Sequence, residues 1–152
     1  MPSTSASEIC FLSSLPAKIT GQKVRFLGCV TDYDPITGVL TLQHPYQPPT
    51  PSTGSGTHVP AHAVRARVNV DLVLKGLTAE QTTVGAWVNV MGYVTGHTAP
   101  TTTASDRGRG PACVDVQALI LWSTGPLDVQ AYERQLDAML TMRTGTVAGT
   151  GT

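Results

Sequence analysis

Apolar and polar residues alternate with a period of two over five stretches of the chain, and this alternation predicts β-strands. In the first stretch, Val24, Phe26 and Val30 fall on one side, and Gly28 between them predicts a bend or bulge. A proline- and glycine-containing turn at 34–38 joins this stretch to the second as a hairpin. The five predicted strands are 23–31, 39–43, 65–74, 87–95 and 113–122.

The last of these strands contains a row of five apolar residues at alternate positions. If the alternation holds along its whole length, all five face the core. They are Val114, Val116, Ala118, Ile120 and Trp122.

Two other segments have a helical pattern. Residues 76–84 predict a short α- or 3₁₀-helix that begins at Thr78. A longer helix follows Pro126 and carries an apolar stripe at the i, i+3, i+7, i+10 and i+11 positions. The stripe consists of Val129, Tyr132, Leu136, Met139 and Leu140.

The order of these elements predicts the fold class. Three strands, a short helix, two strands and a final helix are the elements of an all-β, five-stranded OB-fold barrel with a C-terminal α-helix. An SH3-like or other small barrel remains the alternative. The chain then consists of a flexible N-terminus at 1–8, one domain at 9–142 and a flexible tail at 143–152. Proline-, glycine- and threonine-rich residues at 44–62 and 96–112 predict two long loops within the domain.

Charge and cysteine content narrow the function classes. Only 13% of residues are charged and the formal net charge is zero, so any nucleic-acid binding must come from a local patch. Three cysteines without a CxxC pair do not predict a disulfide framework. The chain starts without a signal-peptide pattern, and its longest apolar run, 118–122, is too short to span a membrane.

No residue pattern predicts catalysis, a cofactor or a metal site. His58 and His62 have the i, i+4 spacing of zinc ligands on a helix, but Pro60 lies between them. We therefore expect a protein that is not an enzyme.

Two groups of residues are candidates for binding. The apolar stripe of the final helix predicts a partner interface, because a complete barrel leaves little core for it to fill; the alternative is that it caps the barrel. Basic residues on two strands that we expect to be neighbours, with one tyrosine, predict a nucleic-acid face; the alternative is that they only solubilise the sheet. These residues are Lys23, Arg25, Arg65, Arg67 and Tyr93.

The sequence also resembles a known family. The similar segments are Leu15-Pro16, Gly21, 23–30 and Asp32-Tyr33, followed by Val70-Asp71, 85–93, 116–122 with Gly125, and the last helix with Tyr132. Over about residues 9–142 they resemble the smallest (Ten) subunit of the telomeric CST complex of filamentous fungi.

This resemblance implies a function and partners. Such a subunit is one OB-fold, similar in architecture to the small subunit of replication protein A. It pairs with the middle (Stn) subunit through OB–OB and helix–helix contacts, and joins the large subunit on single-stranded telomeric DNA in the nucleus. The complex caps chromosome ends and assists DNA polymerase α–primase. The residues alone leave a second interpretation open, a stand-alone OB-fold protein that binds single-stranded nucleic acid.

Overall fold

The computed structural model describes residues 6–46, 64–98 and 112–148, with side chains up to 143. Its strands are β1 (Glu8–Ile9), β2 (Lys23–Asp34), β3 (Val39–Gln43), β4 (Val64–Asn69), β5 (Trp87–Thr98) and β6 (Ala112–Ser123). Its helices are the 3₁₀-helices η1 (Leu12–Ala17) and η3 (Asp71–Gly76) and the α-helices α1 (Ala79–Thr82) and α2 (Val129–Ala148).

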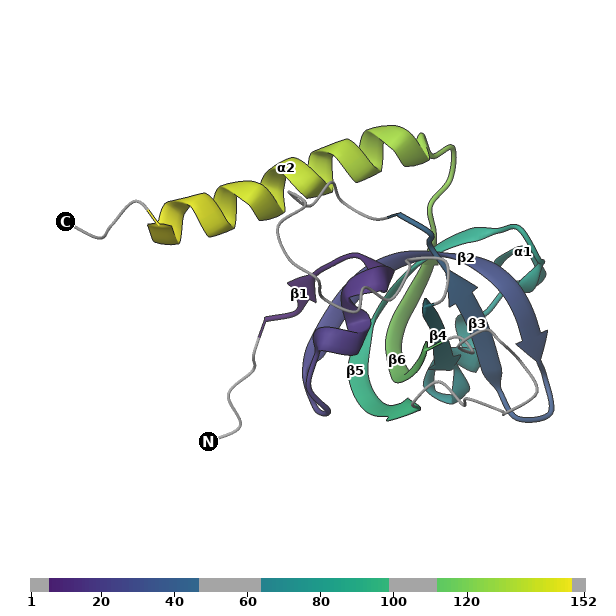
Figure 1. Cartoon of the computed structure of the whole chain (residues 1–152). Coiled ribbons are helices and arrows are strands. Elements are labelled where there is room, and N and C mark those ends of the chain that lie inside the picture. The colour runs from purple at the N-terminus through teal and green to yellow at the C-terminus, as the bar shows by residue number, and fades with distance from the viewer. Residues whose placement is uncertain (1–5, 47–63, 99–111, 149–152) are drawn as a thin grey trace, which may run out of the picture.

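Strands β2 to β6 form a closed barrel. The sheet order is β1-β2-β3-β4-β6-β5, and an additional β2–β5 pairing closes it. All pairs within the barrel are antiparallel except β4 with β6, which is parallel. With η3 and α1 between β4 and β5, this order confirms the predicted five-stranded OB-fold with a C-terminal helix. Figure 1 shows α2 outside the barrel, on the side of β1 and β2.

The barrel core comes from the alternation that the sequence shows. Val24, Phe26 and Val30 of β2 are buried together with the inward residues of the other strands. Gly28 lies between them because there is no room for a side chain: a Cβ at this position would lie 2.8 Å from the Cβ of Leu42. The long β2 can therefore pair with β5 in its first half and with β3 in its second.

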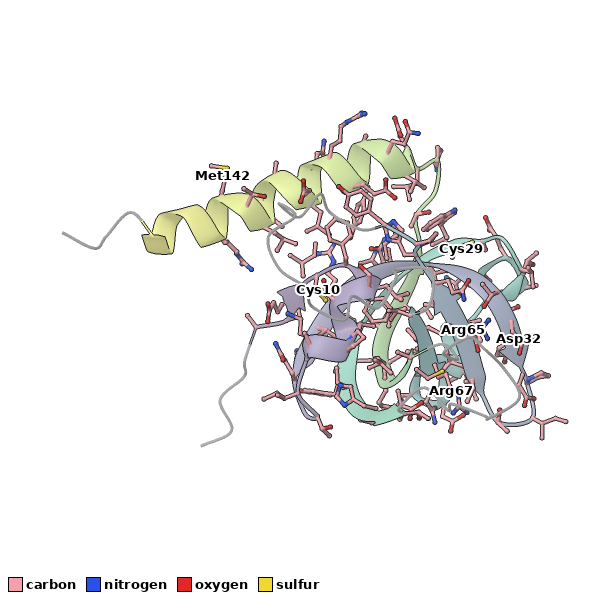
Figure 2. All side chains as sticks on the ribbon, viewed as in Figure 1. Cys10, Cys29, Asp32, Arg65, Arg67 and Met142 are labelled. Atoms are coloured by element: carbon pink, nitrogen blue, oxygen red, sulfur yellow. The ribbon has the colours of Figure 1, made fainter. Side chains whose placement is uncertain are left out.

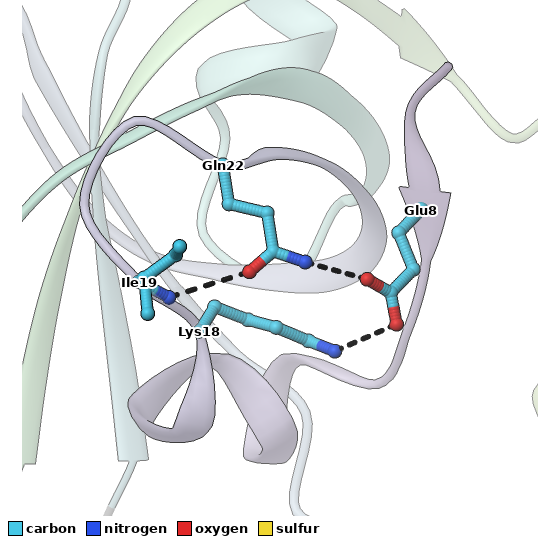
Figure 3. A network of polar contacts seen from close by, with 4 residues as sticks. All are labelled: Glu8, Lys18, Ile19 and Gln22. Carbon is cyan, nitrogen blue, oxygen red and sulfur yellow. Dashed lines mark hydrogen bonds and ion pairs between the residues drawn. The ribbon is translucent and has the colours of Figure 1, made fainter. Parts of the chain in front are cut away.

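The segment before β2 is part of the fold. Cys10, Leu12 and Leu15 are buried in the barrel core. Glu8 was expected in a flexible N-terminus, but it lies in β1, which pairs in parallel with β2. Its carboxylate accepts hydrogen bonds from Lys18 Nζ at 2.9 Å and Gln22 Nε2 at 2.5 Å, and Figure 3 shows this network. The bond from Lys18 lowers the pKa of Glu8.

The third predicted strand is shorter than expected. It ends at Asn69, and the Asn69 side chain accepts a hydrogen bond from the Asp71 backbone N–H at 2.9 Å, which starts a turn into η3. Leu72 and Leu74, predicted to be in the strand, are exposed on η3. The helical prediction for 76–84 is confirmed by α1, which begins with a capping box between Thr78 and Gln81.

The inward row predicted for β6 is wrong beyond Ala118. The register between β5 and β6 shifts at this point, because Gly92 pairs with Ala118 while Met91 pairs with Ile120. Leu119 is the extra residue of this β-bulge. Leu121 therefore packs against the core, while Ile120 is exposed and Trp122 only half-buried.

The predicted loop and tail boundaries also change. Strand β5 continues to Thr98 and β6 begins at Ala112, so only 99–111 of the second loop lies outside the described residues. In the first loop, residues 44–46 are packed, and 47–63 lie outside the described residues. Helix α2 continues to Ala148, six residues into the segment expected to be a flexible tail.

Candidate partner and nucleic-acid surfaces

Helix α2 packs one face against the barrel. Leu136 is only 3% exposed, and the hydroxyl of Tyr132 is buried. Of the residues that the structure describes, three apolar ones are buried but lie outside the hydrophobic core of the barrel: Phe11, Leu27 and Leu136. The expectation that the apolar stripe lacks an intramolecular partner is therefore wrong for Tyr132 and Leu136.

Aromatic rings around His44 lie under the helix. The centroid of the His44 ring is 5.2 Å from that of Trp87, 5.9 Å from Phe11 and 6.4 Å from Tyr132. The ring of Tyr46 lies 4.6 Å from Phe11. Sequence reasoning missed this cluster because residues 44–46 resembled the start of a loop. Two aromatic rings directly after a strand were the available signal.

One polar contact fixes the helix to this cluster. Nε2 of His44 lies 2.8 Å from Oε1 of Glu133, and the His44 side chain is buried. Among the described residues, His44 Nδ1 and the Tyr132 hydroxyl are buried and have no hydrogen-bond partner. Burial raises the pKa of Tyr132, and nearby Arg25 lowers it by a smaller amount.

The C-terminal half of α2 carries exposed apolar residues on one flank, which we call its outer face. Met139 is 39% exposed and Met142 is 73% exposed. They line a shallow hollow of the helix surface together with Gln135, Ala138 and Arg143. Val129 and Leu140 are half-buried, so the predicted stripe divides between two faces.

The predicted basic residues lie in three places. Arg25 is exposed on β2, and its guanidinium carbon is 5.2 Å from the ring centroid of Trp122, a cation–π geometry. Lys23 pairs with Tyr93 across β2 and β5. Arg65 and Arg67 project from β4, and Figure 2 shows them far from Met142 of α2.

Strands β2 and β4 are not neighbours, which corrects our expectation. In the closed barrel, β3 lies between them on one side, and β5 and β6 on the other. The register nevertheless places Lys23, Tyr93, Gln117 and Asn69 in one row across four strands. Arg67 lies in the adjacent row opposite Asp115, with 3.8 Å between Nη1 and Oδ1. The register thus connects Lys23 and Tyr93 to β6 and β4 around the barrel, while Arg25 lies near Tyr132 of α2.

Over 6–46, 64–98 and 112–148, no three metal-ligating side chains come together. His58 and His62 lie outside these residues. None of the helices in the described part of the chain is long and apolar enough to cross a bilayer.

The fold and its surfaces define a class of protein, a single OB-fold barrel with a helix docked beside it. A family model described as "Ten1: Telomere capping, CST complex subunit" matches residues 1–137. The chain belongs to this Ten1 family of telomere-capping CST subunits. No curated protein sequence matches the chain.

Two solved structures from S. pombe have a similar fold. One is the crystal structure of the Stn1–Ten1 complex, with 22% identity over 91% of this chain and 95% of the matched chain, and a TM-score of 0.53. The other is the telomere capping protein Ten1, with 22% identity over 90% of this chain and 99% of the matched chain, and a TM-score of 0.53. At this identity the two structures support the OB-fold assignment.

Proposed function

We propose that this chain is a non-catalytic, nuclear CST subunit that pairs with an Stn1 subunit and supports the binding of single-stranded telomeric DNA and end protection by the complex. Membership of a telomere-capping family supports this function. The pair would join the large subunit at telomeres, and the assembled complex would assist DNA polymerase α–primase.

The observation that supports pairing with Stn1 is that helix α2 packs on its own barrel and still exposes apolar residues. Leu136 packs on the barrel and holds the helix in place, while Met139 and Met142 are exposed on the flank that forms the outer face. Methionine is enriched in the cores of protein interfaces. A helix already docked on its own barrel loses less conformational entropy when it binds a partner helix. We therefore assign the helix–helix contact to this outer face, with Val129 and Leu140 at its margin.

The OB–OB part of the interface fits the outer side of β6 beyond the bulge. Ile120 is exposed there, and Trp122 lies under Arg25. Tryptophan and arginine are the residues most enriched in interface hot spots. This assignment moves Arg25 from the nucleic-acid group to the partner group.

We assign nucleic-acid contact to the outer side of β3 and β4, the side that OB-folds commonly use for oligonucleotides. Arg65 and Arg67 lie there, and Tyr93 and Lys23 extend this surface across β5 and β2. Asp32 and Asp115 lie on the outer side of the same barrel, so we expect modest affinity from this subunit alone.

Co-purification with the Stn1 subunit of the same organism tests the pairing. Met139→Glu places a charge on the outer face of α2, and we expect at least a tenfold weaker complex. Ile36→Glu is the matched control, because Ile36 is 93% exposed at the β2–β3 turn, and it should pair normally. Equal pairing of both variants would exclude the helix face as the interface.

The same preparation separates the alternative function. A stand-alone single-strand-binding protein would remain monomeric beside Stn1 and bind DNA with nanomolar affinity by itself. We expect weak DNA binding by the isolated chain, because its charge balance releases few counterions.

A further inference from the structure

A polar hollow lies on the outer face of the barrel, between β4 and β6. Its volume is about 310 Å³, at the lower end of the range for small-molecule sites. Polar side chains from two parallel strands form most of it, and Val39 and Thr95 lie at its margin. The polar residues are Arg67, Asn69, Asp115 and Gln117.

Local hydrogen bonds determine which atoms of the Asn69 and Gln117 side-chain amides are available to a ligand. The Oδ1 of Asn69 accepts a hydrogen bond from the Asp71 backbone N–H at 2.9 Å, so its amide NH₂ can donate to a ligand. The Nε2 of Gln117 donates to the carbonyl oxygens of Asn69 and Ala118, at 3.4 and 3.3 Å. The Oε1 of Gln117 can therefore accept.

The carboxylate of Asp115 provides the strongest acceptor. Its distance of 3.8 Å to Arg67 Nη1 is too long for a hydrogen bond. The side chains of Asp115 and Arg67 are 38% and 50% exposed, so a ligand can reach both. The hollow thus combines a two-oxygen acceptor with nearby donors from Arg67 and Asn69.

We propose that this hollow binds one guanine base of single-stranded DNA, which rests on the proposed DNA-binding face. The Asp115 carboxylate would accept hydrogen bonds from guanine N1–H and N2–H, and Arg67 or Asn69 would donate to guanine O6 or N7. Guanine alone among the four bases has two adjacent N–H donors on its Watson–Crick edge. Adenine, cytosine and thymine would each place a lone pair against the carboxylate, which is repulsive and leaves the carboxylate without its two hydrogen bonds.

The neighbouring aromatic residue fits this assignment. Tyr93 lies directly opposite Gln117 in the β5–β6 ladder, so both side chains project from the same face. Tyr93 is exposed and can stack on a base next to the hollow. Lys23, opposite Tyr93 on β2, can reach the adjoining phosphate.

Base substitution in a uniform oligonucleotide tests the proposal. The full chain, paired with its Stn1 subunit, is titrated with a dT homopolymer of about 12 nucleotides, within the site size of OB-folds. The same strand is then tested with one central dG, dA or dI. We expect dG to bind about fivefold tighter than dT or dA, the lower end for a bidentate contact because Asp115 is partly exposed. The strand with dI, whose base lacks the N2 amine of guanine, should lose most of the affinity gained with dG.

Two variants locate the effect. Asp115→Asn should abolish the preference for dG, so that dG, dA and dT strands bind with the same affinity, and the loss of a negative charge should raise that common affinity. Asp32→Asn is the matched control, because it removes the same charge from exposed β2, and it should keep the preference. Equal affinity of the unmodified pair for dG, dA and dT, or a dG preference that persists in Asp115→Asn, overturns the guanine site while the DNA-binding face stands. No binding to any strand overturns both.

Discussion

Nε2 of His44 and Oε1 of Glu133 lie 2.8 Å apart although 89 residues separate them in the sequence. His44 directly follows β3, and Glu133 lies in the second turn of α2. The contact therefore joins the C-terminal helix to the barrel within one subunit. It positions the outer face of α2 before any partner binds.

Glu133→Ala tests this link. The substitution leaves the buried His44 without its partner, and we expect a loss of about 1–3 kcal/mol in the free energy of unfolding. Urea unfolding followed by circular dichroism measures it. Glu80→Ala, an exposed glutamate of α1, is the control and should change stability by less than about 0.5 kcal/mol. Equal effects of the two variants would show that the His44–Glu133 contact does not hold the helix.

Two glycines of β5 should respond differently to the same change. A Cβ at Gly92 would lie 2.0 Å from the backbone oxygen of Gln117, whereas at Gly96 the nearest atom would be Asp115 Oδ2 at 3.5 Å. We expect Gly92→Ala to cost at least about 3 kcal/mol or to prevent folding, because backbone must move. Gly96→Ala should be nearly neutral. Thermal unfolding of both variants measures the difference. Similar melting temperatures would contradict the close approach of Gly92 to the Gln117 backbone.

Stability should fall in alkaline solution because of Cys10. Burial raises the pKa of this thiol from 9.0 to about 11. Between these values the unfolded chain loses the thiol proton and the folded chain keeps it, so raising the pH favours unfolding. The expected loss is about 2–3 kcal/mol between pH 9 and 11. Chemical denaturation across this range should show a steeper decline for the native chain than for Cys10→Ala, and parallel curves would refute the assignment.

Arg65→Ala should weaken binding of single-stranded DNA to the assembled pair. If Arg65 contacts one phosphate, the slope of log affinity against log salt concentration should fall by about 0.7. Fluorescence anisotropy at several salt concentrations measures the slope. Lys75→Ala removes a charge from η3, away from β3 and β4, and should leave the slope unchanged. An unchanged slope in Arg65→Ala would remove this residue from the DNA-binding face.

The barrel was predictable because apolar and polar residues alternate along most of its strands. Val24, Phe26 and Val30 are buried as their spacing indicates, and the turn at 34–38 joins β2 to β3. The strand order follows from the number of strands and the position of the short helix. The identity of the core residues therefore follows from the period of two.

The parts that failed depend on contacts between distant residues. His44 follows a strand and precedes prolines, so only its packing against Trp87 and Glu133 shows that it is buried. The stripe of α2 predicts an amphipathic helix but not which of its residues meet the barrel. The separation of β2 from β4 follows from barrel closure, which no local pattern shows. The alternation also gave no sign of the bulge at Leu119.

The bulge at Leu119 gives the two halves of β6 different environments. Before it, Asp115 and Gln117 face outward, and after it Ile120 and Trp122 do so. If β6 paired without this bulge and kept Leu119, a strict alternation would turn Ile120 and Trp122 toward the core and expel Leu121. Insertion or deletion of one paired residue of β6 should therefore be far less tolerated than a substitution, whereas deletion of Leu119 itself would leave its neighbours on their present faces. When related sequences are aligned, the number of residues between the polar half and the apolar half of this strand can therefore show whether the bulge is present.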